Sequence, residues 1–190
     1  MISKHGKWTG EFGLWLTNYL NTISCYRKHS VFYDHGNKQE HPNVVAIKGF
    51  IGNHVTNANR LADVDVLVAN DKQEIIVLIE IEESNITPKT LLGDVFASLM
   101  CNGFAVRIGC DQKYFTINPD SKLIVSGVVP ARDCKKEKFN ELIWPRLQQF
   151  IVANDSIQVR NIDFVFGKDI SSTIDALMEK MKELFPEKDG

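Results

Sequence analysis

The sequence lacks the features that mark a membrane or secreted protein. No apolar run among its 190 residues is long enough to cross a bilayer. The N-terminal segment MISKHGKWTGEFGLW has neither the apolar stretch nor the cleavage site of a signal peptide. We therefore expect a cytoplasmic protein that does not contact a membrane.

Cysteine is scarce, and its spacing excludes the common zinc-binding patterns. The four cysteines are scattered, with no C-x-x-C pair between them. We expect reduced thiols rather than zinc ligands or disulfides. These residues are Cys25, Cys101, Cys110 and Cys134.

An excess of positive charge is also absent. Lys and Arg number 22 against 24 Asp and Glu, which gives a formal net charge of -2. A protein held to nucleic acid by its overall charge would be basic, so any such contact here has to come from a local basic patch.

The length suits a single domain, residues 1–190, with a sizeable core.

The most informative stretch is residues 60–84, RLADVDVLVANDKQEIIVLIEIEES. It predicts two strands joined by a turn at residues 70–73. The second strand starts with five consecutive apolar residues, 75–79, which is typical of a strand covered on both faces in the middle of a sheet.

Carboxylates gather at the end of this apolar strand. Glu80 and Glu82 are two residues apart and share one face, as do Asp63 and Asp65 on the preceding strand. If the strands pair as a hairpin, the acids converge, and crowded carboxylates need a proton or a cation. Oxygen ligands favour Mg²⁺, with Mn²⁺ as a substitute. A half-exposed strand whose glutamates face water would carry the same alternation.

The rest of the chain predicts an α/β protein with a mixed central sheet flanked by helices. Apolar residues at helical spacing predict helices at residues 10–26, 88–102, 135–152 and 172–184. Short apolar runs predict further strands at residues 44–50, 104–108, 123–129 and 157–166. The strands on either side of the second helix are expected to form a parallel pair.

Local signals refine the helix boundaries. Thr87 is expected to cap the second helix, with Pro88 in its first turn. Pro145 is expected to kink the third helix. Asp169 or Ser171 is expected to cap the last helix.

Three polar segments have an ordinary structural interpretation as well as a functional one. Residues 27–43 predict a polar loop whose histidines lack metal-ligand spacing. Residues 52–59 are rich in amide and hydroxyl side chains, which suit contacts to phosphates or base edges, although composition alone favours an ordinary polar loop. Three lysines at positions 135, 136 and 138 fit a solvated helix face better than a DNA contact.

The order helix, three strands, helix, strand, with acids on the second and third strands, resembles the PD-(D/E)xK nuclease superfamily. The motif match is VDVLV at residues 64–68 followed by LIEIE at residues 78–82. The resemblance covers about residues 11–108 as an αβββαβ, restriction-endonuclease-like core, with residues 109–190 as a C-terminal extension. It implies that Asp65 and Glu80 bind the metal, with Asp63 as an alternative to Asp65.

The sequence departs from the family at the third motif position. A lysine usually follows two residues after the second acid, and Glu82 stands there instead. A minority of restriction enzymes also carry glutamate there, and in some members the lysine lies on the following helix, where this chain has Lys89. The family often has a further acid in its first helix, for which Glu11 is the candidate.

The resemblance implies a Mg²⁺-dependent DNA endonuclease. A type II restriction-like enzyme is the kind that it suggests, and such an enzyme usually works as a homodimer. Asp65, Glu80 and Glu82 would be metal ligands, Glu82 alternatively a general base, and Lys89 would offset phosphate charge. The rival interpretation is a catalytically inactive nuclease-fold domain that binds nucleic acid or a protein partner. A third is a nuclease that acts on RNA or on DNA ends.

Overall fold

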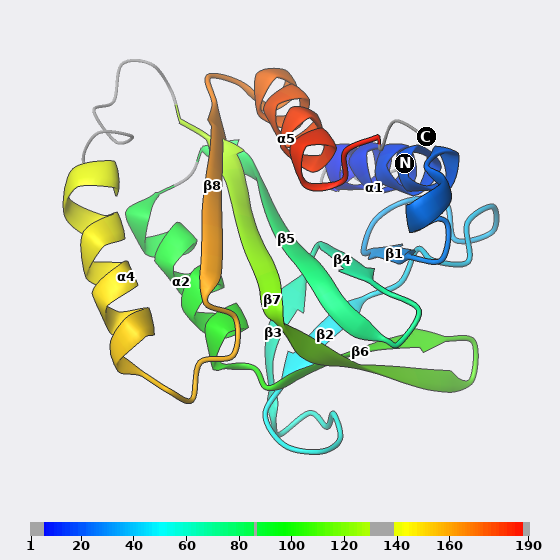
Figure 1. Ribbon diagram of the computed structural model, residues 1–190, viewed down its shortest axis with the longest axis horizontal. Coiled ribbons are helices and arrows are strands. Elements are labelled where there is room, and N and C mark those ends of the chain that lie inside the picture. Colours follow the sequence, from blue (N-terminus) through cyan, green and yellow to red (C-terminus); the bar gives the residue numbers. More distant parts are fainter. Residues whose placement is uncertain (1–5, 86, 130–138, 188–190) are drawn as a thin grey trace.

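The computed structural model describes residues 6–85, 87–129 and 139–187, and it shows an α/β protein built on a mixed eight-stranded sheet (Figure 1). The strands are β1 (Ser30–Tyr33), β2 (Ile47–Phe50), β3 (Arg60–Val64), β4 (Val66–Ala69), β5 (Glu74–Asn85), β6 (Gly103–Ile108), β7 (Asp111–Val128) and β8 (Asn161–Gly167). The helices are α1 (Lys7–Thr22), α2 (Pro88–Met100), α4 (Trp144–Ala153) and α5 (Ile170–Leu184), with a short 3-10 helix at Ser24–Tyr26 and a π-helical turn at Phe139–Ile143.

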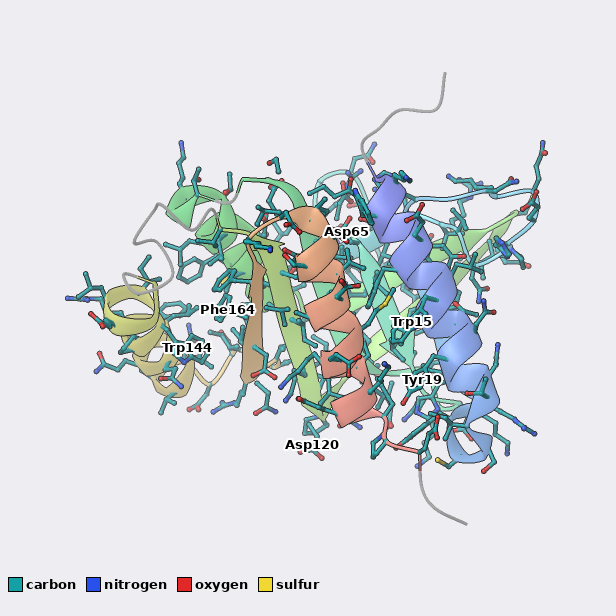
Figure 2. The ribbon with its side chains drawn as sticks, turned by 90° about the horizontal axis from the view of Figure 1, so that it is seen from above. Trp15, Tyr19, Asp65, Asp120, Trp144 and Phe164 are labelled. Atoms are coloured by element: carbon teal, nitrogen blue, oxygen red, sulfur yellow. The ribbon has the colours of Figure 1, made fainter. Side chains whose placement is uncertain are left out.

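Helices cover both faces of the central strands. Alternate residues of β5 point to opposite sides, so Leu78 packs with the core beneath α2 and α4, whereas Ile79 packs with the core beneath α1 and α5. Figure 2 shows α1 and α5 lying along one side of the sheet. The apolar run in β5 is thus buried on both faces, as the sequence predicts.

The sheet combines parallel and antiparallel pairing, and β7 is its longest strand. The first part of β7 pairs antiparallel with β6, and its second part runs parallel to both β5 and β8. The expected parallel pairing across α2 is wrong in one respect: β6 does not pair with β5. Gly109, with φ 61°, turns the chain back after β6, so the strand that reaches β5 is β7.

The second arm of the sheet is antiparallel. β2 lies between β3 and β6, and β6 joins this arm to β7. The predicted strand over residues 60–69 is broken at Asp65: β3 pairs with β2, whereas β4 pairs with β1 and β5. One predicted strand is therefore two strands, which pair in different parts of the sheet.

Several boundaries differ from the sequence-based expectation. The predicted polar loop contains β1, whose last three residues are buried because it pairs with β4. Helix α1 begins at Lys7, and β8 begins only at Asn161. The π-helical turn Phe139–Ile143 runs directly into α4, so Pro145 lies in the first turn of α4, just after the point where the helix type changes. The lysines at 135, 136 and 138, and Cys134, lie outside the described residues.

Other local signals are confirmed. Thr87 caps α2 through a reciprocal pair of hydrogen bonds with Thr90, and Asp169 caps α5 in the same way with Ser172. The turn between β4 and β5 falls at the predicted residues 70–73.

Cys25, Cys101 and Cys110 are free thiols. No helix in the described ranges is long and apolar enough to cross a membrane.

Candidate functional site

The bend between β3 and β4 brings Asp65 beside the acidic end of β5. The Asp65 carboxylate accepts a hydrogen bond from the main-chain N–H of Ile81 at 2.7 Å. The main-chain carbonyl of Asp65 accepts from the N–H of Asp34, which follows β1, at 2.9 Å. Asp65 is thus held from two sides, and it lies near the start of α1 (Figure 2).

Glu80 lies on the face of β5 that packs against α2. Its side chain is only 8 % exposed, and its carboxylate accepts a hydrogen bond from the Ser98 hydroxyl of α2 at 2.9 Å. The Ser126 hydroxyl of β7 donates to the main-chain carbonyl of Glu80 at 3.2 Å. Glu82, two residues further, is on the same side and interacts electrostatically with Asp94 of α2.

These acids line a cleft of about 200 Å³ at the end of β5. The acidic residues that line it are Asp63, Asp65, Glu80, Glu82, Glu83 and Asp94. His35 also lines the cleft, and none of its described lining residues is Lys or Arg. We call this hollow the acidic cleft.

Burial and mutual repulsion disfavour ionisation of the inner carboxyls. Burial raises the pKa of Asp65 to about 7; the Ile81 N–H opposes this rise, and the neighbouring acids Asp34, Glu83 and Asp94 add to it. Burial and then the nearby Asp65 raise the pKa of Glu80 well above its usual range, although the Ser98 hydrogen bond opposes this shift. Burial and Glu82 also raise the pKa of Asp94. The cleft therefore favours a bound proton or cation.

Two of the acids have structural roles. Glu83 points to the opposite face of β5, where it accepts hydrogen bonds from the N–H groups of Gly6 and Thr9 at 3.1 and 3.0 Å and from the Thr9 hydroxyl at 3.1 Å. It thereby caps the start of α1, whose own N-cap residue, Gly6, supplies no side-chain hydrogen bond. Asp63 is ion-paired with Lys48 and Arg60.

Two predicted residues do not reach the acidic cleft. Lys89 lies in the first turn of α2, where its side chain is exposed and does not line the cleft. Glu11 is exposed on α1, is ion-paired with Lys7 at 3.6 Å and lines a different hollow. Neither residue lines the cleft with Asp65 and Glu80.

The donor chemistry of the cleft fits a hard divalent cation in kind. Asp65 and Glu80 offer carboxylate oxygens, and no cationic side chain lines the cleft with them. Within the described ranges, however, no three His, Cys, Asp or Glu side chains are already arranged to hold a metal ion. Glu82 instead accepts hydrogen bonds from the N–H and hydroxyl of Ser84.

The sequence interpretation missed two cleft residues. Asp94 lies on α2 one turn before Ser98, so the available signal was the i, i+4 spacing of the two polar side chains that follow the first turn of the helix. His35 had no such signal, because it reaches the cleft only through the pairing of β1 with β4.

Comparisons of the chain with protein-family models, with curated proteins and with solved structures found no match.

Proposed function

We propose that the protein is a Mg²⁺-dependent endonuclease that hydrolyses phosphodiester bonds in DNA, with Asp65 and Glu80 as metal ligands. The observation that carries the proposal is the pair formed by these two residues: neighbouring carboxyls with raised pKa values, in a cleft without a cationic lining residue. Such a pair is costly unless it binds a proton or a cation.

The order of the central elements supports the likeness to PD-(D/E)xK nucleases. Helix α1 is followed by three adjacent antiparallel strands, β1, β4 and β5, then by α2 and by β7, which is parallel to β5. Asp65 directly precedes the second of these strands, and Glu80 lies on the third. This αβββαβ path ends at Val128 rather than at residue 108. The antiparallel arm of β2, β3 and β6 is an addition to it.

The residues at the acidic cleft would have the following roles in phosphodiester hydrolysis. Asp65 and Glu80 would hold the metal, and the bound metal would lower the pKa of a water molecule and neutralise phosphate charge. Glu82 would leave its contacts with Ser84 to complete the ligand set or to accept a proton from the attacking water. Ser98 would orient the Glu80 carboxylate through its hydrogen bond. Because Lys89 does not line the cleft, we do not assign it a contact there.

An inactive nuclease-fold domain that binds nucleic acid or a protein partner is the second candidate. The specific observation that favours it is the absence, within the described ranges, of three ligands already arranged for a metal. The presence of Glu82 in place of the family's usual lysine also favours an inactive domain. Uptake of Mg²⁺ or Mn²⁺ through Asp65 and Glu80 separates the two functions.

The homodimer also remains a proposal that follows from the resemblance. Exposed apolar side chains on α2, on α4 and on the π-helical turn before α4 offer a surface for such an interface. They include Phe96, Leu142 and Phe150, which line one shallow apolar hollow.

Cleavage of supercoiled plasmid DNA tests the proposed activity. The protein should nick or linearise the plasmid with Mg²⁺ or Mn²⁺ but not with EDTA, and Glu80→Gln should abolish cleavage. Glu40→Gln is the matched control, because Glu40 is exposed and does not line the acidic cleft. Cleavage by folded Glu80→Gln, or none by the unaltered protein with either metal, would contradict the proposal.

A further inference from the structure

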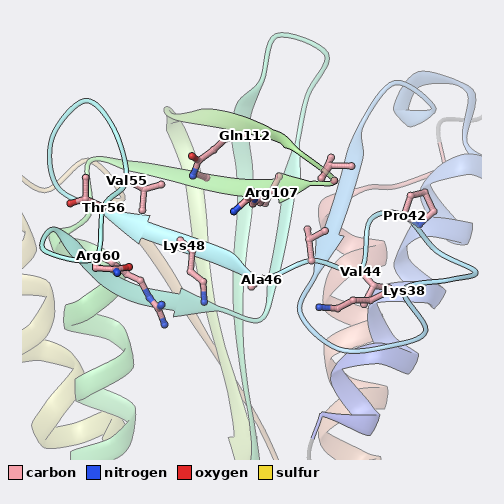
Figure 3. A pocket seen from close by; sticks show the side chains of 16 residues that line it. Lys38, Pro42, Val44, Ala46, Lys48, Val55, Thr56, Arg60, Arg107 and Gln112 are labelled. Carbon is pink, nitrogen blue, oxygen red and sulfur yellow. The ribbon is translucent and has the colours of Figure 1, made fainter.

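A second hollow, about 720 Å³ in volume, carries the charge opposite to that of the acidic cleft. Its charged lining residues are Lys38, Lys48, Arg60 and Arg107, and no described Asp or Glu side chain lines it. In a chain with a net charge of -2, four cations on one hollow are a marked separation of charge. We call this hollow the basic groove (Figure 3).

The antiparallel arm of the sheet positions these cations. Lys48 on β2 lies directly opposite Asp63 on β3 and Ala105 on β6. Arg107 is two residues beyond Ala105, so it shares the same face of the sheet, and it lies opposite Gln112 on β7. Figure 3 shows Lys48 and Arg60 pointing in the same direction from neighbouring strands, and Lys38 reaching the groove from the loop after β1.

The basic groove adjoins the acidic cleft through Asp63. Lys48 and Arg60 line the groove, and both are ion-paired with Asp63, which lines the cleft. These two cations are therefore partly neutralised. Lys38 and Arg107 are exposed and have no ion pair with a described residue, so they remain available to an anionic ligand.

The amide-rich loop at residues 52–59 forms one wall of the groove. Asn59 shapes this loop: it accepts a hydrogen bond from the N–H of Thr56 at 2.7 Å and donates to the carbonyls of Ile51 and His54 at 2.7 and 2.8 Å. Asn57 has no such role and lines the groove with its side chain exposed. The loop therefore offers an amide to the groove beside the cations.

We propose that the basic groove binds the phosphodiester backbone of double-stranded DNA, with Lys38 and Arg107 as phosphate contacts. Cationic side chains and exposed amides on a concave surface without acids match a polyanionic backbone. The inference rests on the proposed function for its substrate, because a strand held in the groove would pass the border at Asp63 toward the acidic cleft. The groove would also supply cationic side chains for the phosphates, because no described Lys or Arg lines the acidic cleft.

Binding of a fluorescent DNA duplex, measured by anisotropy in EDTA over a range of salt concentrations, tests the proposal independently of cleavage. The double variant Lys38→Ala/Arg107→Ala should bind at least about tenfold more weakly than the unaltered protein at low salt. The slope of log affinity against log salt should fall by about 2, one for each lost phosphate contact. Lys28→Ala is the matched control, because Lys28 is exposed before β1 and does not line the groove. It should bind normally.

Each contrary outcome has a definite meaning. No duplex binding by the unaltered protein, or unchanged affinity and salt slope in the double variant, would overturn the groove proposal. Stronger competition by an RNA duplex of the same sequence would also overturn it, in favour of RNA. Glu80→Gln should bind DNA normally in EDTA, so a failure of metal-dependent cleavage would contradict the nuclease proposal but not the proposed DNA binding by the groove. Cleavage without groove-dependent binding would contradict the groove proposal but not the nuclease proposal.

Discussion

The carboxylate of Asp65 accepts a hydrogen bond from the main-chain N–H of Ile81 at 2.7 Å. This contact joins the bend between β3 and β4 to the acidic end of β5, and it holds Asp65 close to Glu80, the residue that precedes Ile81. Two acids that are fifteen residues apart thereby form the inner end of one cleft. The pH dependence of the protein should follow from their proximity.

The substitution Asp65→Asn should stabilise the protein at pH 8. Burial raises the pKa of Asp65 from 3.8 to about 7, so the folded state binds the proton more tightly than the unfolded chain does. This contribution to stability is full below pH 4 and is lost as the pH rises from 4 to 7. An amide avoids the ionisation and can still accept the Ile81 hydrogen bond.

Urea unfolding at pH 4 and pH 8 measures this effect. One unit of pKa difference corresponds to about 1.4 kcal/mol, and partial access of water lowers the full effect, so we expect a gain of about 1–3 kcal/mol at pH 8. Little difference is expected at pH 4. A variant that is less stable than the unaltered protein at pH 8 would show that the Asp65 carboxylate is balanced by a partner.

The substitution Glu83→Ala should loosen the start of α1. The Glu83 carboxylate accepts hydrogen bonds from the N–H groups of Gly6 and Thr9 and from the Thr9 hydroxyl, and it complements the positive end of the helix dipole. Loss of a helix cap costs about 1–2 kcal/mol in free energy of unfolding, which thermal or urea unfolding would detect.

Glu11→Ala provides the comparison on the same helix. Its ion pair with Lys7 is exposed on both sides, and such pairs contribute about 0–1 kcal/mol. Equal losses for Glu83→Ala and Glu11→Ala would mean that the contacts of Glu83 with Gly6 and Thr9 do not cap the helix.

The substitution Ser98→Ala should move DNA cleavage to higher pH rather than abolish it. The Ser98 hydroxyl donates to the Glu80 carboxylate and lowers its pKa, so the variant needs a higher pH to ionise Glu80. The acidic limb of the pH–rate profile should shift upward, and the rate should recover at alkaline pH.

Ser121→Ala is the control for removal of a buried hydroxyl, because the Ser121 hydroxyl has no hydrogen-bond partner among the described residues. Its profile should match that of the unaltered protein. A Ser98→Ala enzyme with a uniformly lower rate and an unmoved acidic limb would rule out a positioning role through Glu80.

Short-range patterns predicted the central strands and the acids on them. The apolar run of β5 and the alternation of Glu80 and Glu82 depend only on neighbouring residues, and so do the caps at Thr87 and Asp169. These features were placed correctly from the sequence because strand and helix periodicity is local.

Features that depend on distant pairing were not predictable in this way. β1 lies in a polar segment and becomes a strand only because β4 pairs with it. The bend at Asp65 assigns β3 and β4 to different parts of the sheet, and no local signal marks it. His35 and the cations Lys38 and Arg107 likewise reach their sites through tertiary structure alone.

The binding of Mn²⁺, followed by electron paramagnetic resonance at pH 8, tests the proposed metal site at Asp65 and Glu80 most directly. We expect saturable binding by the unaltered protein, loss of binding in Asp65→Asn and Glu80→Gln, and unchanged binding in the Glu40→Gln control. Absence of binding by the folded, unaltered protein, or full binding by Glu80→Gln, would contradict a metal site at Asp65 and Glu80.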